Sequence, residues 1–335
     1  MHNHQGIKMI LTPEQLATAE RLMSILFPYA VRRRNELQAR NGRFVHYTSA
    51  DNALKIINTK CIWMRNTTCM SDFREVRHGL DALNRYFSIE DGTRRQAFVA
   101  ALDQCSAGVA GETFNLFNQW WQKTELQTYI TSISEHDDRE DIHGRLSMWR
   151  AFGNSTARVA IVIKLNTDVG RNVALGAVLS PVGYFTDAEL FREFDLVTTK
   201  IRENVDFLRG MNRNVLLGSV LEMLTTTVVS LKHEGFHEER EWRIVHSPAR
   251  RPSPHLPSTV EVVAGVPQRV YKIPFQNRAD ANLTALSPNE MLDRIIIGPS
   301  QFPWAMYEAF VEALEAAGVA DASNRVFTSQ IPVRS

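Results

Sequence analysis

The pattern of apolar and polar residues along the chain predicts a mixture of strands and helices. An alternating run at 129–134 and an apolar run at 157–165 are typical of central strands. Further short strands are expected at 44–48, 61–65, 242–246, 271–275, 294–297 and 325–331. Helices are expected from Thr12 toward Arg34 and at 50–58, 73–127, 186–231 and 303–317. Because these elements mix without a regular β-α-β alternation, the sequence predicts an α+β fold.

The same pattern predicts how the chain is divided. Residues 1–42 read as an N-terminal helical extension, and Thr12-Pro13-Glu14-Gln15 has the capping pattern of a helix start. Residues 43–335 read as a single domain with helical insertions near 73–127 and 186–231. The loop at 247–258 is rich in Pro and Arg and is expected to be exposed.

Composition narrows the class of protein. The chain has 335 residues, 44% of them apolar, which is enough for a full core. Its net charge of +1 gives no overall attraction to nucleic acid or membrane, so such a partner would need a local patch. Three cysteines without paired spacing favour a reducing compartment. No segment approaches the ~20 apolar residues of a spanning helix, and we expect a cytoplasmic protein without a secretory leader.

The most informative segment is 44–57. Here a β-prone run carries His46 and Thr48, and a helix is expected to start immediately afterwards. A side chain at such a junction can face a cleft beside the free backbone N–H groups of the helix start. That arrangement suits a ligand that carries phosphates.

A run of arginines precedes this segment. Cations near a helix end favour the helix dipole and are usually solvated. The alternative is a phosphate-binding or nucleic-acid-binding patch beside His46. The arginines concerned are Arg32, Arg33, Arg34, Arg40 and Arg43.

Several common site motifs are absent, including the glycine-rich dinucleotide fingerprint and the Walker phosphate loop. One motif does match: His233, Glu234 and His237 fit the His-Glu-x-x-His pattern of zinc hydrolases. Gly235 inside the motif and the lack of a third ligand at a familiar spacing favour a helix end and loop that lead into a strand at Glu239. We therefore expect no metal, with a zinc hydrolase as the alternative.

The segment 239–245 is the second polar cluster. As a strand it would place Glu239, Glu241 and Arg243 on one face. An exposed ion pair of this kind is worth under ~1 kcal/mol and would be structural. The functional alternative is a carboxylate that stabilises an oxocarbenium-like centre, as in glycosidic bond cleavage.

Five segments in this order resemble a widespread bacterial family of unknown function, number twenty-nine seventy-one in the usual domain numbering. They are His46-Tyr47-Thr48-Ser49, Ser71-Asp72-Phe73-Arg74-Glu75, Ser132-Ile133-Ser134, Met148-Trp149 and Glu239-Arg240-Glu241-Trp242-Arg243. The resemblance covers most of 44–300. The chain departs from the family pattern at Ser71, at Phe152 and near Ala157-Arg158, which leaves the roles of Ser71 and Phe152 open.

The start of this family is similar to toxin enzymes that ADP-ribosylate thymidine in DNA, through His46, Thr48, Asp51, Asn52 and the apolar pair Ile56-Ile57. This likeness implies an ADP-ribosyltransferase-like mixed sheet that uses NAD as co-substrate. It further implies that His46 and Glu241 carry the catalytic site and face one cavity. The implied NAD-binding residues are His46, Tyr47, Thr48, Asn52, Ser132, Ser134, Trp149 and Glu239.

Some consequences of the resemblance stay open. The aromatic residue that stacks on nicotinamide could be Tyr47, Trp149 or Tyr184. The acceptor is expected to be DNA or RNA rather than protein, although the two-glutamate pattern resembles transferases that act on arginine. Such an enzyme could be a toxin or a phage-defence effector with an antitoxin partner. A third possibility is a module of the same fold without chemistry that binds nucleic acid through 32–43 and Arg250-Arg251.

Overall fold

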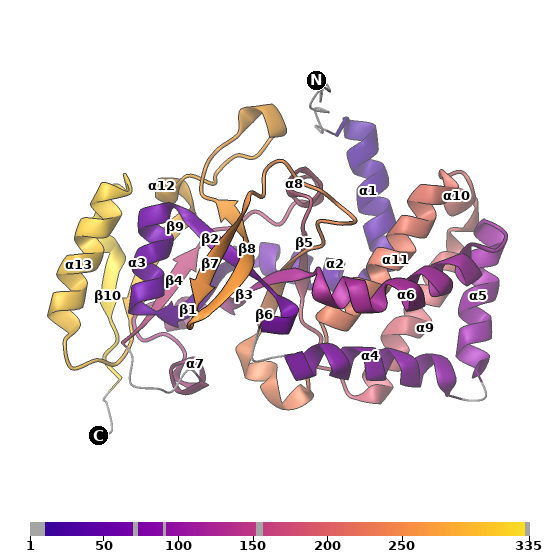
Figure 1. Cartoon of the computed structure of the whole chain (residues 1–335), viewed down its shortest axis with the longest axis horizontal. Coiled ribbons are helices and arrows are strands. Elements are labelled where there is room, and N and C mark those ends of the chain that lie inside the picture. Colours follow the sequence, from indigo (N-terminus) through magenta and orange to yellow (C-terminus); the bar gives the residue numbers. More distant parts are fainter. Residues whose placement is uncertain (1–10, 70–72, 90–91, 152–156, 332–335) are drawn as a thin grey trace.

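The computed structural model of the chain describes residues 11–69, 73–89, 92–151 and 157–331. Over this part of the chain, a ten-stranded sheet lies beside a group of helices, and further helices cover the sheet (Figure 1). The expected α+β class is therefore confirmed. None of the helices in the described ranges is both long and apolar enough to cross a bilayer.

The sheet is organised around β3 (Tyr129–His136). One edge of β3 pairs with β6 (Glu241–His246), which in turn pairs with β5 (Val178–Pro181). The other edge pairs with two different strands, β1 (Arg43–Ser49) near one end and β2 (Cys61–Asn66) near the other. Pairing with β1 stops at Val45, opposite Ser134, and pairing with β2 stops at Ile130. The sheet therefore splits beside 131–133.

Each half of the split sheet continues outward. Beyond β1 follow β4 (Arg158–Ile163), β9 (Leu292–Ile297) and the parallel strand β10 (Val326–Thr328). Beyond β2 follow β8 (Val266–Pro274) and β7 (Ser258–Val263). The continuous apolar run of β4 is explained by burial of both its faces, since Val159, Ala160 and Val162 are fully buried.

The N-terminal helix differs from the prediction. Instead of one helix to Arg34, there are two, α1 (Pro13–Leu26) and α2 (Pro28–Ala39). Pro28 has no N–H to continue α1, and it disfavours helical geometry at Phe27, whose φ of −129° and ψ of 51° form the break. The proline is the sequence signal that marks this division.

The two predicted helical insertions pack against each other. They form α4 (Phe73–Ser88), α5 (Thr93–Cys105), α6 (Val109–Leu126), α9 (Asp187–Glu203), α10 (Val205–Arg209) and α11 (Arg213–Val229). Their shared core includes Phe98, Leu102, Ile201 and Leu224, and it reaches the sheet at Ile130. Figure 1 shows this helical group to one side of the strands.

The remaining helices lie on and around the sheet. They are α3 (Ala50–Thr59), α7 (Leu146–Ala151), α8 (Val169–Leu175), α12 (Pro288–Met291) and α13 (Pro303–Ala316). The strands β5 and β7 and the helices α7, α8 and α12 were not predicted. β5 has only four residues, and most side chains of β7 are exposed, so β7 lacks the buried face that would mark a strand in the sequence. The strand expected from Glu239 begins at Glu241, after a 3₁₀ helix at Glu234–Glu239.

Candidate functional site

Four polar side chains project from one face of β3 and β6. Ser132 lies opposite Arg243 and Ser134 lies opposite Glu241, so the antiparallel register places all four on the same face. The Ser132 hydroxyl donates to Glu241 Oε1 at 2.5 Å, and Arg243 Nε donates to the same oxygen at 2.8 Å. Glu241 is therefore fixed by a residue of its own strand, β6, and by a residue of the adjacent strand β3.

This cluster is buried. Glu241 is 6% exposed and Arg243 is 1% exposed. Burial on its own would raise the pKa of Glu241, but the charge and hydrogen bonds of Arg243, with further contributions from Lys232 and Ser132, outweigh it and hold the pKa below its usual value. The carboxylate is consequently ionised at neutral pH.

Lys232 links the two glutamates of the predicted pair. Its Nζ lies 2.6 Å from Glu239 Oε2 and 3.6 Å from Glu241 Oε2. Glu239 precedes the strand instead of belonging to it, yet Lys232 brings the two carboxylates to one place. The expected proximity of Glu239 and Glu241 is therefore present, with a lysine between them in addition to Arg243.

The backbone before Glu241 is held by a second set of contacts. Arg240 has a left-handed φ of 44°, and the N–H of Glu241 donates to the Tyr184 hydroxyl at 2.9 Å. The Arg145 guanidinium donates to the carbonyl oxygens of Glu238 and Glu239 at 2.9 Å and 3.0 Å. These contacts fix the turn that delivers Glu241 to the sheet.

His46 contacts the same serine from the other direction. Its Nδ1 lies 2.9 Å from the backbone carbonyl oxygen of Ser132, in the gap where the sheet splits. Burial lowers the pKa of His46, and the bond to the Ser132 carbonyl opposes this only in part. His46 is paired with Ile161 of β4 and lines a cavity together with Ile133 and Ile244.

His46 and Glu241 therefore lie on opposite faces of the sheet. Val45 pairs with Ser134, which pairs with Glu241, so these three share a face, and His46 as the next residue of β1 projects to the other. The sequence led us to expect both side chains in one cavity. The structure instead joins them through Ser132, which uses its hydroxyl for Glu241 and its carbonyl for His46.

The aromatic candidates are occupied by packing or backbone contacts. Tyr47 and Trp149 are each 6% exposed and pack edge to face with ring centroids 4.9 Å apart. The Tyr47 hydroxyl accepts from the N–H of Arg145 at 2.8 Å, and Trp149 Nε1 donates to the His143 carbonyl at 2.8 Å. Tyr184, beside Glu241, is the candidate that lies nearest to the carboxylate cluster.

Two further predicted residues lie at the junction of β1 and α3. Thr48 is on the same face of β1 as His46, as alternation along the strand requires. Asn52 is exposed in the first turn of α3, where its N–H donates to the side chain of Ser49, the N-cap residue. The first turn of α3 is thus capped by the protein itself. Ser71 and Phe152 lie outside the described residues.

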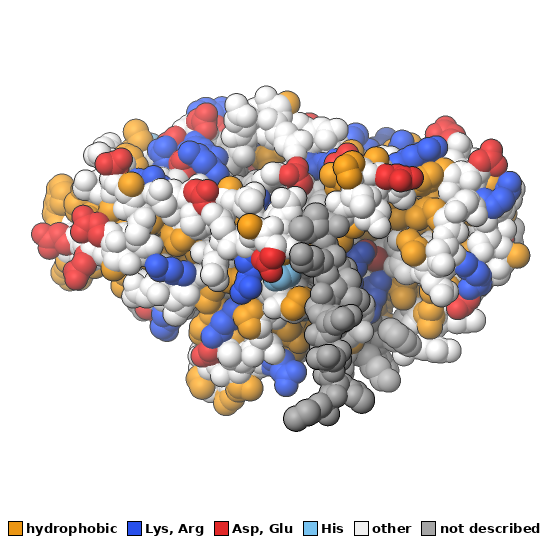
Figure 2. Space-filling model, turned by 90° about the horizontal axis from the view of Figure 1, so that it is seen from above, with side chains coloured by type: hydrophobic (Ala, Val, Ile, Leu, Met, Phe, Trp, Pro, Cys, Tyr) orange, Lys and Arg blue, Asp and Glu red, His pale blue; other side chains and the backbone are white. Residues whose placement is uncertain are grey.

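Most of the basic segment is neutralised by carboxylates. Arg33 and Arg40 both bind Glu135, and Arg32 binds Glu193. Arg43 is 9% exposed and binds three aspartates, Asp138, Asp141 and Asp293. Arg34 is half-buried on α2. Positive and negative side chains are also interspersed on the face shown in Figure 2.

The His-Glu-x-x-His segment forms an exposed 3₁₀ helix rather than an α-helix. His233 Nδ1 accepts from the N–H of Gly235 at 3.1 Å, and His237 Nδ1 lies 3.1 Å from the Glu234 carbonyl oxygen. Both rings are used locally. Within the described ranges, no group of three or more His, Cys, Asp or Glu side chains is arranged to hold a metal ion.

Three residues were missed by the sequence analysis: Arg145 and Lys232, which contact the segment around Glu241, and Glu135, which binds the arginines of α2. Lys232 immediately follows the buried helix α11 and Leu231, a position where an exposed lysine would look the same in sequence. Glu135 follows the strand expected at 129–134 and belongs to β3. A charged residue that directly continues an apolar strand is a sequence signal that could have indicated a buried ion pair. Arg145 precedes α7 and has no pattern that distinguishes it.

A family model described as "Protein of unknown function (DUF2971)" matches residues 148–244. The matched segment includes Glu239 and Glu241 and ends one residue after Arg243, whereas His46 and Ser132 precede it. It is shorter than the 44–300 that the resemblance suggested. No curated protein and no solved structure matches the chain.

Proposed function

We propose that the protein is an NAD-dependent ADP-ribosyltransferase in which Glu241 is the catalytic carboxylate. The observation that carries the proposal is the hydrogen bond from the Ser132 hydroxyl to Glu241 at 2.5 Å, on adjacent central strands. The strand β1, which carries His46, pairs with the other edge of β3 and contacts Ser132 through the His46 ring. The residues that the resemblance implies are His46, Ser132 and Glu241, and they lie on β1, β3 and β6.

The chemistry of this cluster fits the reaction. Cleavage of the bond between nicotinamide and ribose C1′ releases neutral nicotinamide and builds positive charge on the sugar. An ionised carboxylate near C1′ stabilises that charge more in the transition state than in the ground state. The acceptor then forms a bond to C1′ and loses a proton. The charge of Glu241 supports the proposal, because Arg243 and Lys232 keep the carboxylate ionised although it is buried.

The face that carries Glu241 also offers a hydroxyl group, that of Ser134, to bind a ribose hydroxyl. Ser134 shares the face of Glu241, and no hydrogen bond joins its hydroxyl to another described residue. We assign Ser134 to substrate contact and Ser132 to positioning of Glu241. Arg145 and Tyr184 are positioning residues too, because they fix the backbone on either side of Arg240.

His46 takes a different role from the one the sequence suggested. Its side chain lies on the face opposite Glu241 and binds the backbone of Ser132. We therefore assign His46 to holding β1 against β3 at the split, and not to contact with the ribose beside Glu241.

The acceptor is proposed to be a macromolecule, with nucleic acid ahead of protein only through the resemblance. The basic segment does not strengthen that choice, because carboxylates already neutralise Arg32, Arg33, Arg40 and Arg43. From the same resemblance we also propose that the enzyme is a toxin or a phage-defence effector and that an antitoxin binds it.

Incubation of the purified protein with NAD labelled on the adenylate, in parallel with DNA, RNA and protein pools, tests this function. The proposal expects label in one pool and one free nicotinamide for each label transferred. If NAD is neither consumed nor transferred in any pool, the proposed activity is wrong. Label in protein alone would retain the reaction and overturn the choice of acceptor.

A further inference from the structure

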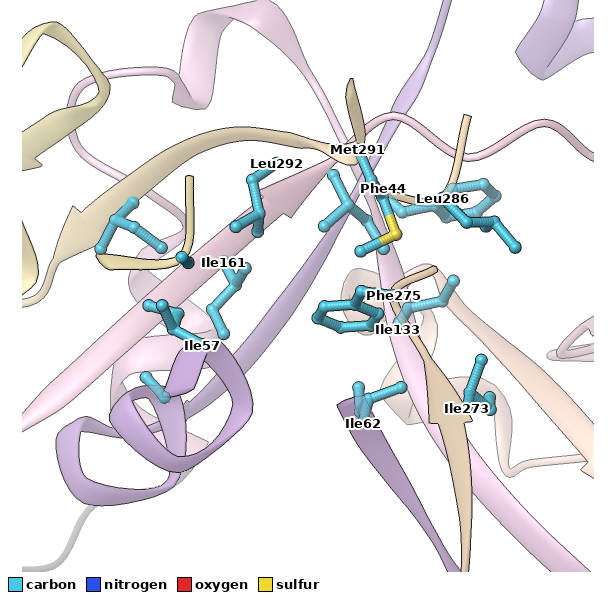
Figure 3. Packing of buried hydrophobic residues seen from close by; sticks show 14 of the residues in the cluster. Phe44, Ile57, Ile62, Ile133, Ile161, Ile273, Phe275, Leu286, Met291 and Leu292 are labelled. Carbon is cyan, nitrogen blue, oxygen red and sulfur yellow. The ribbon is translucent and has the colours of Figure 1, made fainter. Parts of the chain in front are cut away.

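A cavity of about 60 Å³ lies on the His46 side of the sheet. Its walls are mostly aliphatic and come from both halves of the split sheet, with Ile161 of β4 in one half and Ile273 of β8 in the other, and from Ile133 of the central strand β3. In Figure 3, Ile161 lies on one side of this region and Ile133 and Phe275 lie on the other. At ~10–15 Å³ for each water-sized probe, the cavity has room for several waters or one small organic molecule.

The imidazole of His46 offers a ligand in this cavity a polar atom. Its ring is enclosed by protein yet retains accessible surface, and it lines the cavity. Nδ1 is engaged with the Ser132 carbonyl, which can only accept, so Nδ1 carries the proton. Because burial keeps the imidazole neutral, Nε2 presents a lone pair, and among the described residues the ring's hydrogen bond is the one from Nδ1.

Arg171 also lines the cavity but does not set the ligand's chemistry. It is 8% exposed and its Nη2 donates to the Thr284 carbonyl at 2.6 Å. Its Nη1 has no partner but is packed out of solvent contact. The lining also includes Asn166, whose side chain binds Asp168, and Asn172. A ligand in the open volume therefore meets walls that are mostly aliphatic, with His46 Nε2 as a hydrogen-bond acceptor.

We propose that this cavity is a binding site for a small, uncharged apolar molecule that carries one hydroxyl group, such as a phenol or a short alcohol. The hydroxyl donates to His46 Nε2, and the apolar body contacts the walls built from both halves of the sheet. An anion is disfavoured, because it would leave water for walls that are mostly aliphatic, it would meet the Nε2 lone pair, and Arg171 Nη1 is packed away from the open volume. The site lies on the face opposite Glu241 and does not rest on the proposed function.

Titration of the wild-type protein with phenol, toluene and benzoate, followed by NMR of the histidine rings and by thermal unfolding, tests the proposal. Phenol is expected to bind about 3- to 10-fold more tightly than toluene through one hydrogen bond, and to shift the His46 ring signals. Benzoate is expected to bind least. Absence of phenol binding, or tighter binding of benzoate than phenol, would overturn the proposal.

Two variants separate the cavity from the hydrogen bond. Ile161→Phe fills the cavity and should abolish binding of both phenol and toluene. His46→Phe keeps a ring at the site but removes the acceptor, so phenol should lose its advantage over toluene. If that advantage persists in folded His46→Phe protein, His46 is not the acceptor. The wild-type titration decides the proposal if either variant fails to fold.

Discussion

His46 and Glu241 bind the same residue from opposite faces of the sheet. The His46 imidazole lies 2.9 Å from the Ser132 carbonyl oxygen, and the Glu241 carboxylate accepts from the Ser132 hydroxyl at 2.5 Å. Ser132, on the central strand β3, thus contacts side chains from both β1 and β6. Displacement of β1 at His46 would be transmitted to Glu241 through the backbone of one residue.

Replacement of Ser132 by alanine should therefore destabilise the protein more than the same change at Ser134. Ser132→Ala removes a hydrogen bond to a buried charge and should lower the free energy of unfolding by about 1.5–3 kcal/mol. Ser134→Ala removes no hydrogen bond to a described residue and should cost less than about 1 kcal/mol. Urea unfolding of both variants measures the difference. Equal losses would show that the hydroxyl of Ser132 does not hold Glu241.

The arginines on α2 should act on stability through Glu135. Arg33, Arg40 and Trp242 donate hydrogen bonds to the nearly buried Glu135 carboxylate. Replacing both arginines by alanine removes its two charged donors and leaves that of Trp242. We expect a loss of about 2–3 kcal/mol, because water can reach part of the site. Arg32→Ala, which removes an exposed pair with Glu193, should cost under about 1 kcal/mol. Denaturant unfolding compares the two, and an equally small effect of the double change would argue against the ion-pair assignment.

The contact between α4 and α11 should not tolerate a side chain at Gly79. A Cβ at this position would lie 2.1 Å from the Val228 carbonyl oxygen, so the helices would have to separate. Gly79→Ala should destabilise the protein by about 3 kcal/mol, at the upper end of overpacking effects. Gly111 on α6 is exposed, and a Cβ added there would meet no atom within 4 Å, so Gly111→Ala should stabilise the helix by about 0.5–1 kcal/mol. Thermal unfolding of the pair should show opposite signs.

Stability should fall as the pH drops below about 6.5, the ordinary pKa of histidine. Burial lowers the pKa of His46, of His136 and of His246 in the folded protein. The unfolded chain then binds more protons than the folded one, so acid favours unfolding by about 1.4 kcal/mol per pH unit for each such proton. Urea unfolding between pH 5 and pH 8 measures the slope.

A matched pair of variants identifies the source of that slope. His246→Gln removes one buried imidazole and should make the dependence on pH shallower. His143→Gln changes an exposed side chain and serves as the control. A slope that is the same in both variants would exclude His246 as a contributor.

Much of the architecture was readable from local patterns, and the reasons are visible in the structure. The segment 43–59 forms a strand and a helix capped by Ser49, because a β-prone run is followed directly by an N-cap residue. The apolar run at 158–163 forms a strand buried on both faces. By contrast, β5 depends on pairing with β6 and has too few residues to carry a pattern of its own.

The site was readable only in part. Alternation correctly placed Glu241 and Arg243 on one face, whereas Glu239, expected on the same strand, precedes it. Alternation could not show that His46 faces the other side, because that depends on the register between β1 and β3, which the long segment 50–128 separates in sequence. The ion pairs of Arg33, Arg40 and Arg43 were hidden for the same reason, since their carboxylate partners are distant in sequence.

The most direct test of the central claim compares Glu241→Gln with Glu135→Gln in the release of nicotinamide from NAD. Both changes neutralise a buried carboxylate that pairs with arginine, so both should destabilise the protein. Only Glu241 lies in the proposed catalytic cluster. At a temperature where both variants are folded, we predict a loss of at least about 100-fold in rate for Glu241→Gln and less than about 3-fold for Glu135→Gln. Equal rates in the two variants would contradict the assignment of Glu241 as the catalytic carboxylate.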